Sequence, residues 1–448
     1  GQARTGRALR AMSETAGQPD VRASRLSRDE IEANFADLHP PLGRSEALIE
    51  ADRCYFCFDA PCTAACPTGI DIPVFIQKIR SDNVRGSART ILGENIMGGM
   101  CARVCPTEIL CEEACVRTAH EENPVEIGLL QRYATDPIIE GGVQLFARAA
   151  PSGKTVAVVG GGPAGLSCAH RLSTLGHDVV VFNRDEKPGV LNEYGIAAYK
   201  TVDDFAQTEI DYILSIGGVE VRNNVALGED VQLPELIDAY DAVFLGIGLS
   251  RANDLGIEGE DLDGVVNAID YIAELRQAED KSALPVGRTV VVIGGGMTAI
   301  DIAVQSRHLG AEQVHIVYRR GPDDMSASAF EQALAQTSGV AIHHRAPPNR
   351  ILADEHVPGV EFTSDGGRFV LFADMVFKAI GQQIEGFSEF VMQNGRIVVD
   401  AGHRTSIDGV WAGGDCVVGG SDLTVTAVQH GKLAAIDIDR ALRGTSDG

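Results

Sequence analysis

The sequence predicts an α+β multidomain fold, in which a mostly α-helical N-terminal domain precedes two nested Rossmann-like α/β domains. Three features of the 448 residues predict it: eight of the ten cysteines lie between residues 52 and 117, and two later stretches each read as strand, glycine-rich turn, helix and strand. The expected segments are a disordered stretch 1–26, a helical domain 27–150, a first nucleotide domain in two parts, 151–286 and 386–448, and a second nucleotide domain 287–385.

The eight clustered cysteines predict a double [4Fe–4S] domain. Such packed thiols, in a chain with no secretory signal, argue against disulfides. A C-x2-C start and a C-x3-C-P ending are more typical of iron–sulfur ligation than of zinc. Two structural zinc sites of four thiolates each remain the alternative. The first group is Cys54, Cys57, Cys62 and Cys66, and the second is Cys101, Cys105, Cys111 and Cys115.

The rest of the N-terminal domain reads as helices. Ser27, with Glu30 three residues on, is typical of a capped helix start, and we expect Pro40 and Pro41 to end that helix. A helix should lead into the first cysteine group, one or two amphipathic helices should separate the groups, and another should follow Cys115.

The stretch from Lys154, KTVAVVGGGPAGLSCAHRLSTLGHDVVVFN, predicts a βαβ unit. Gly160, Gly162 and Gly165 fill the pattern G-x-G-x-x-G, which lets the backbone approach a pyrophosphate at a helix N-terminus. The flanking strand and helix strengthen the prediction of dinucleotide binding, although a tight βα turn is the structural alternative.

The pattern returns at Gly294, Gly296 and Ala299, which predicts a second bound nucleotide. An acid at the end of the second strand binds a ribose hydroxyl, whereas an arginine accommodates a 2′-phosphate. Arg319 and Arg320 occupy this place and favour NADPH over NADH, unless they form only a solvated basic turn. The first unit has Asn183 there, which can bond a ribose hydroxyl without charge assistance.

Later strands indicate how the two nucleotide domains are nested. We expect 201–285 to complete the first domain, with a strand in DAVFLGIG, while DMVFKAIG forms the corresponding strand of the second. A strand at Trp411 and a helix starting at Thr424 then return to the first domain. The insertion between Arg288 and Gly381 is therefore typical of a flavin domain that contains a nicotinamide domain.

Composition and charge disfavour several classes of partner. The formal net charge of −25 disfavours nucleic acid and anionic membrane surfaces. No apolar run approaches the roughly 18 residues of a membrane span. Reduced thiols and the lack of an export signal favour the cytoplasm.

Met12 is a candidate natural start, so residues 1–11 are not used to predict the fold.

Four stretches carry a family resemblance: DRCYFCFDAPCTAACPTGIDIPVFI, LNEYGIAAYK, FLGIGL and AGGDCVVGG with DLTV. They resemble the flavin subunit of bacterial two-subunit dihydropyrimidine dehydrogenase and, more distantly, the small subunit of glutamate synthase. The resemblance covers nearly the whole chain from about residue 27. It implies FAD, two [4Fe–4S] clusters and NADPH or NADH as cofactors.

The resemblance also implies how the cysteines are shared. Handing the last cysteine of one group to the other cluster is a ferredoxin-type pattern, and Cys101 would then be a buried thiol outside both clusters. The alternative places all of the second group, Cys101 included, around one cluster. The implied sets are Cys54, Cys57, Cys62 and Cys115 for one cluster, and Cys66, Cys105, Cys111 and Gln131 for the other.

The nucleotide contacts implied by the resemblance follow the two glycine-rich turns. Three positions depart from the family pattern: Asn183 replaces a glutamate, Val190 replaces a glycine, and Met297 replaces an aspartate. The first two should weaken FAD retention. The implied flavin contacts are Gly160, Gly161, Gly162, Pro163, Ala164, Gly165, Asn183, Leu191, Lys200, Gly414, Asp415, Thr424 and Val425. The implied nicotinamide contacts are Gly295, Gly296, Met297, Thr298, Arg319, Arg320, Ala379 and Gly381.

By resemblance the chain is an electron-transfer subunit with no catalytic acid or base of its own. NAD(P)H passes hydride to FAD, and single electrons leave through the clusters. A partner subunit carrying FMN and further clusters would then reduce uracil or thymine. The alternatives are the glutamate synthase small subunit and a cluster-bearing binding protein without turnover.

Overall fold

The computed structural model describes residues 20–352, 359–384 and 386–444, which fall into two compact units. Unit 1 takes the described residues up to Leu38, together with Tyr194–Val202 and Arg251–Gln383. Unit 2 takes His39–Glu193, Asp203–Ser250 and the described residues from Ile384 onward. Each unit contains one five-stranded parallel sheet.

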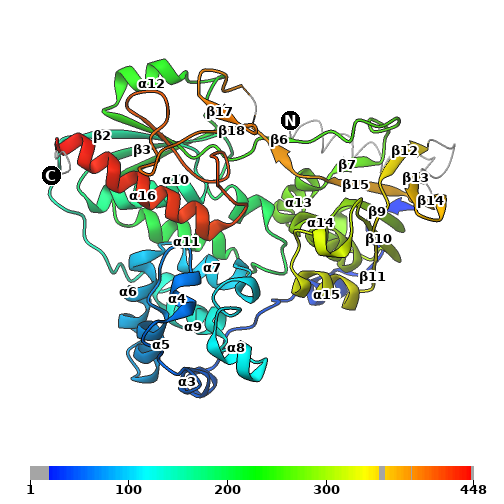
Figure 1. Ribbon diagram of the computed structural model, residues 1–448, viewed down its shortest axis with the longest axis horizontal. Coiled ribbons are helices and arrows are strands. Elements are labelled where there is room, and N and C mark those ends of the chain that lie inside the picture. Colours follow the sequence, from blue (N-terminus) through cyan, green and yellow to red (C-terminus); the bar gives the residue numbers. More distant parts are fainter. Residues whose placement is uncertain (1–19, 353–358, 385, 445–448) are drawn as a thin grey trace. The chain divides into compact units, whose positions relative to one another are not determined.

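The N-terminal part of unit 2 is helical, as the sequence predicts (Figure 1). Two helices, α5 and α6, separate the cysteine groups, and Asp71 and Asn83 cap them through backbone amides. Their apolar faces, with Phe75 and Ile91, pack into the core beneath the cysteines. The helices are α3 (Arg44–Asp52), α4 (Pro61–Ala65), α5 (Ile72–Arg80), α6 (Val84–Glu94), α7 (Gly98–Val104), α8 (Val116–Glu121) and α9 (Ile127–Ile139), with a 3-10 turn at Thr107–Ile109.

The sheet of unit 2 has the strand order β19-β5-β2-β3-β4. Val156 and Val158 of β2 share a core with α10 and α16, whereas Ala157 and Val159 belong to the other core, with α12. Figure 1 shows α10 and α16 beside each other and α12 away from them. Burial on both faces explains the unbroken apolar run of β2. The elements are β2 (Thr155–Val159), α10 (Pro163–Thr174), β3 (Asp178–Asn183), α11 (Phe205–Leu214), β4 (Val219–Asn223), α12 (Leu233–Ala239), β5 (Ala242–Leu245), β17 (Met392–Gln393), β18 (Arg396–Ile397), β19 (Val410–Ala412) and α16 (Thr424–Arg443).

The sheet of unit 1 has the order β11-β10-β9-β15-β7, and a three-stranded antiparallel sheet, β12-β13-β14, accompanies it. The second predicted βαβ unit is confirmed as β9, α14 and β10. The elements are β6 (Arg251–Ala252), β7 (Val265–Asn267), α13 (Ala268–Gln277), β8 (Val286–Gly287), β9 (Thr289–Gly294), α14 (Met297–His308), β10 (Gln313–Val317), α15 (Ala329–Thr337), β11 (Val340–His343), β12 (Pro348–Leu352), β13 (Gly359–Ser364), β14 (Gly367–Phe372), β15 (Met375–Ala379) and β16 (Gln382–Gln383).

Two expectations about segments need correction. The stretch 201–285 does not complete one domain, because β7 pairs with β15 in the sheet of unit 1 and α13 packs beside it. The stretch 1–26 was expected to lack structure; residues 1–19 lie outside the described residues, but Val21–Arg22 forms β1, which pairs with β8. In both cases the local sequence can indicate that a strand forms, but it does not indicate which other strand it pairs with.

The capped helix near the N-terminus is α2 (Arg28–Asn34) of unit 1, and it has the predicted capping box of Ser27 with Glu30. The helix ends at Asn34, before Pro40 and Pro41, so the prolines do not terminate it. Phe35 leaves the helix and packs edge-to-face on His308 of α14, which fixes the chain direction at that point.

Candidate functional site

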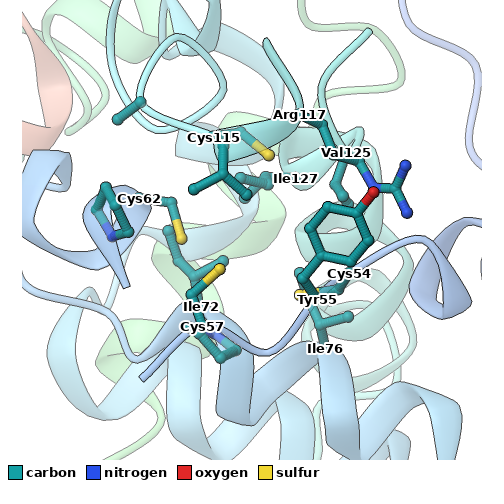
Figure 2. A pocket seen from close by; sticks show the side chains of 14 residues that line it. Cys54, Tyr55, Cys57, Cys62, Ile72, Ile76, Cys115, Arg117, Val125 and Ile127 are labelled. Atoms are coloured by element: carbon teal, nitrogen blue, oxygen red, sulfur yellow. The ribbon is translucent and has the colours of Figure 1, made fainter. Parts of the chain in front are cut away.

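Four cysteines from both sequence groups meet around one cavity in unit 2 (Figure 2). Cys54 and Cys57 follow α3, Cys62 lies in α4, and Cys115 directly precedes α8. Their sulfur atoms border the same space, which Ile72, Ile76, Val125 and Ile127 close with apolar side chains.

The local backbone explains how the first group folds around this cavity. Phe56 and Ala60 both adopt positive φ, 54° and 36°, which turns the chain sharply between the cysteines. The Phe56 amide lies 3.4 Å from Cys54 Sγ and donates to it. Burial raises the pKa of Cys54 and raises that of Cys62 to about 11. Burial therefore favours the protonated thiols near neutral pH, and a bound metal cation would favour the thiolates instead.

The four thiols around this cavity are soft ligands that suit a metal centre. A single zinc ion would hold all four sulfurs about 2.3 Å from one point, whereas a [4Fe–4S] cluster is also held by four thiolates but at separate irons. That this centre is a cluster remains a prediction.

A second set of thiols lies beside the first. The hydrogen bond with Cys101, burial, and the nearby Cys111 and Cys66 all raise the pKa of Cys105. Cys101 is buried, whereas Cys115 lines the cavity formed with Cys54, Cys57 and Cys62. The structure thus places Cys115 at the first cavity and Cys105 beside Cys101, Cys111 and Cys66, and the division of these thiols between clusters remains a prediction.

Gln131 lies on α9, buried, and its amide group has a fixed orientation. Its Nε2 donates to the Gly98 carbonyl oxygen at 2.7 Å, and Gly98 opens α7, the helix that ends just before Cys105. With the amide nitrogen so engaged, the side-chain oxygen is the atom left to bind a metal. The assignment of Gln131 and the three thiols as one ligand set remains a prediction.

The first glycine-rich turn, between β2 and α10, allows close backbone approach. Gly160 has φ +106°, and a Cβ there would lie 2.2 Å from the Gly246 carbonyl oxygen. A Cβ on Gly165 would lie 1.9 Å from the Gly160 carbonyl oxygen. Gly162 caps α10 without a side-chain hydrogen bond, so the first amides of this helix are available to an anion.

Asn183, at the end of β3, presents an unpaired acceptor to this turn. Its Nδ2 donates to the Asp185 carbonyl at 2.8 Å and to Asn223 Oδ1 at 3.0 Å. Its Oδ1 is buried without a hydrogen-bond partner among the described residues. This oxygen lies 2.7 Å from where a Cβ on Gly161 would stand. A buried acceptor beside the glycine turn fits a ribose hydroxyl donor.

The other predicted flavin contacts of unit 2 gather near the same turn. The Thr424 hydroxyl, at the start of α16, donates to Asn192 Oδ1 at 2.8 Å. A Cβ on Gly414, which has φ +90°, would lie 3.4 Å from Ala164 Cβ. Burial, reinforced by Asp422, raises the pKa of Asp415 to about 6. Leu191 follows Val190, whose φ is +44° and whose Cβ would stand 3.4 Å from a Cβ on Gly162.

Lys200 lies elsewhere, in unit 1. Its buried ammonium is 2.7 Å from Asp301 Oδ1 and 2.6 Å from Glu331 Oε1. The sequence analysis missed both carboxylates, because one acidic residue on each of two separate helices forms no recognisable motif. The glycine turn belongs to unit 2, and the flavin contact of Lys200 remains a prediction.

The second glycine-rich turn, between β9 and α14 in unit 1, also requires small residues. A Cβ on Gly294 would lie 2.1 Å from the Ala379 carbonyl oxygen, and one on Gly295 would lie 2.4 Å from the Tyr318 ring. Met297 and Thr298 begin α14, and Gly381 follows β15 with φ +84°. Arg319 and Arg320 follow β10 and are exposed. The ring of Tyr318, which the sequence analysis missed, packs directly against Gly295 in this turn.

Comparison with known proteins shows the family. The model for pyridine nucleotide-disulphide oxidoreductases matches residues 154–431, and the model described as dihydropyrimidine dehydrogenase domain II, 4Fe-4S cluster, matches 31–143. The NAD-dependent dihydropyrimidine dehydrogenase subunit PreT of Escherichia coli K12 is 33% identical over 92% of this chain and 98% of its own. The glutamate synthase [NADPH] small chain of the same strain is 33% identical over 90% and 92%.

Solved structures agree on the fold. Thioredoxin reductase of Lactococcus lactis superposes with a TM-score of 0.54 at 21% identity, covering 65% of this chain and 99% of its own. No helix in the described ranges is both long and apolar enough to cross a bilayer. The chain belongs to the pyridine nucleotide-disulphide oxidoreductase family, and its N-terminal part also matches the 4Fe-4S model of dihydropyrimidine dehydrogenase domain II.

Proposed function

We propose that the chain is the NAD(P)H-oxidising, electron-input subunit of a dihydropyrimidine dehydrogenase and binds FAD and two [4Fe–4S] clusters. The observation that carries the proposal is the meeting of Cys115 with Cys54, Cys57 and Cys62 around one cavity, in a chain that also has two dinucleotide turns. The PreT relatives, which match over nearly their whole length, are named as subunits of that NAD-dependent enzyme.

The residues present fit these cofactors. The turn from Gly160 to Gly165 would hold the FAD pyrophosphate, and Asn183 Oδ1 would accept from its ribose. When bound, FAD takes a hydride from the reduced nicotinamide and the clusters carry its electrons onward singly. The protein supplies orientation, thiolate ligands and an apolar surround, and it needs no acid or base of its own.

The contacts within unit 2 support an order for the two ligand sets. Asn192, bonded to Thr424 on the flavin side, directs its amide at Met97 Sδ, 3.6 Å away, at the start of α7. Because α7 lies between Met97 and Cys105, we place the ligand set that includes Cys105 on the flavin side. The other cavity is bordered by exposed Tyr55, so we place the exit of electrons to a partner subunit there.

Anaerobic co-purification from the native cell tests the proposal. We expect FAD, about eight iron and eight acid-labile sulfide per chain, and a flavin band that NADH or NADPH bleaches. With an FMN-containing partner subunit, oxidation of the nicotinamide should depend on uracil or thymine. Zinc in place of iron, or a flavin-free protein that no reduced nicotinamide affects, would refute the proposal and favour a binding protein without turnover.

Nucleotide choice is testable at the arginine pair. The double variant Arg319→Ala with Arg320→Ala removes the charges expected to meet a 2′-phosphate. Because such charge-assisted bonds contribute about 1.5–3 kcal/mol, KM for NADPH should rise at least about tenfold, with little change for NADH. Flavin reduction kinetics with both nucleotides measure this. Equal effects on both would show that the pair is only a solvated turn.

The glutamate synthase small chain is the second candidate, because it is as similar in identity as PreT. In that case the acceptor subunit would carry out glutamine-dependent reductive amination of 2-oxoglutarate. Electron delivery to an amidotransferase subunit, without uracil reduction in the presence of any FMN partner, would favour this reading. The co-purified partner distinguishes the two directly.

A further inference from the structure

Glu209 is a buried carboxyl between the flavin part and the cysteine part of unit 2. It lies on α11, and only 1% of its surface is exposed. Its Oε1 accepts from the Gly99 amide at 2.8 Å and from the Met100 amide at 3.1 Å. Its Oε2 is buried without a hydrogen-bond partner in the described part of the chain.

The backbone of α7 is shaped to admit this carboxyl. A Cβ on Gly99 would lie 2.8 Å from Glu209 Oε1 and 2.6 Å from the Phe205 ring, so only glycine permits the approach. The same turn is held from the other side, because Gln131 Nε2 bonds the Gly98 carbonyl oxygen. One helical turn thus links Glu209 to the residues expected to hold the flavin-side cluster.

The charges around Glu209 leave it poorly compensated. Arg103 is the nearest cation, but its guanidinium is paired with Asp136 through two contacts of 2.8 Å and lies 3.4 Å over the Phe205 ring. Burial therefore outweighs the two amide bonds and Arg103, and raises the pKa of Glu209 to about 8. The charged and titratable side chains that act on it are Arg103 of α7, Asp136 of α9 and Tyr212 of α11.

We propose that Glu209 is a proton-coupling residue, which takes up a proton when the cluster expected at Cys66, Cys105, Cys111 and Gln131 gains an electron. The inference rests on the proposed function for the presence of that cluster. One electron arriving from the flavin adds one negative charge in a desolvated region, which favours the carboxylic acid over the carboxylate. At a pH near or above 8, where the carboxylate is populated in the oxidised protein, up to one proton from solvent binds at Oε2, and it is released when the electron moves on.

Glu209 is thus a positioning residue for α7 as well as a charge regulator, and the two roles have different readouts. A purely structural role leaves the midpoint potential of the cluster independent of pH. A coupling role makes that potential fall as the pH rises from 7 to 9. The limit is 59 mV per tenfold change in proton concentration, for one proton per electron.

Redox titration of the holoprotein, followed by electron paramagnetic resonance between pH 6 and 9, tests the proposal. The native protein should show one cluster whose potential falls with pH. In Glu209→Gln the potential should be constant and stay near the native value at low pH, because the amide cannot ionise. Asp211→Asn, an exposed change on the same helix, should keep the native dependence. A native potential independent of pH, or a slope retained in Glu209→Gln, overturns the proposal.

A measurement on the native protein covers the case that Glu209→Gln does not fold. The reduced-minus-oxidised infrared difference spectrum at pH 8 should contain the carbonyl stretch of a newly protonated, buried carboxylic acid. Absence of that band overturns the inference. Iron, sulfide and flavin content separate the two proposals: a protein without them refutes the proposed function and this inference together, whereas a loaded protein without coupling refutes this inference alone.

Discussion

Cys115 joins the two cysteine groups, because it lines the cavity of Cys54, Cys57 and Cys62. Cys115→Ser should therefore remove one cluster and lower the iron and sulfide content by about half. Cys101→Ser is the matched control, since Cys101 is buried outside the cavity, and it should retain both clusters. Metal analysis after anaerobic purification measures the difference. Loss of iron from Cys101→Ser as well as from Cys115→Ser would instead support a cluster built from the whole second group.

Val190 stores backbone strain beside the flavin turn, since its φ of +44° is a conformation that suits glycine. The left-handed region costs a β-branched residue about 1–2 kcal/mol. Val190→Gly should relieve this strain and free space beside Gly162, so FAD should bind more tightly. Titration of the apoprotein with FAD measures the dissociation constant. Glu122→Gly, at φ +52° in the helical part, is the control and should leave it unchanged; weaker binding in Val190→Gly would contradict the argument.

Asn183 shows what a single residue type can and cannot predict. The end of a strand after a glycine-rich turn indicated a ribose contact, but not which atom would be available. The structure shows that Nδ2 is engaged twice while Oδ1 is unpaired. An aspartate here would direct an oxygen at two acceptors, so the asparagine matches its surroundings although it departs from the family pattern.

Helix α16 is the element that ties the flavin part of unit 2 to the cysteine part. The buried ammonium of Lys432 donates to the carbonyl oxygens of Thr68 and Glu94 at 2.9 and 3.0 Å, and it also contacts Glu94 Oε2 at 2.8 Å. A lone lysine in an amphipathic helix gives no such indication in the sequence. Its partners lie hundreds of positions away and become visible only in the folded chain.

Lys432→Met should loosen this connection, because the buried Thr68 carbonyl and the partly buried Glu94 carbonyl lose their donor. The expected loss is about 2 kcal/mol of unfolding free energy, together with faster loss of iron in air. Chemical denaturation and the rate of cluster bleaching measure the two effects. Arg443→Met, near the exposed end of the same helix, is the control. Equal behaviour of both variants would show that Lys432 contributes no specific connection.

At the scale of the whole molecule, Glu209 predicts how stability depends on pH. Its pKa is raised from 4.5 to about 8 in the folded protein, so the folded state holds the proton more tightly than the unfolded chain between these values. Its contribution is therefore fully present below about pH 4.5 and is lost as the pH rises through 8. Asp415, with its pKa raised to about 6, acts in the same direction over a lower window.

The difference in unfolding free energy between the native protein and Glu209→Gln separates the contribution of Glu209 from that of the other titrating groups. Unfolding free energies at pH 5, 7 and 9 should show that the native protein loses more stability with rising pH than the variant does. The exposed Asp211→Asn variant should follow the native curve. If the native protein lost no more stability with rising pH than Glu209→Gln does, the raised pKa of Glu209 would be contradicted.

Residue spacing along the chain was enough to predict the local features: two groups of thiols, two glycine turns with their strands and helices, and the capped start of α2 at Ser27. Each depends on residues close in the chain, whose spacing constrains φ, helix phase or metal ligation. The features that depend on distant partners became visible in the folded chain. The tertiary structure placed Cys115 with Cys54, moved β7 into the sheet of unit 1, paired Lys200 with Asp301, and buried Glu209 against α7. Burial and pairing arise from packing between segments far apart in sequence, which no local pattern encodes.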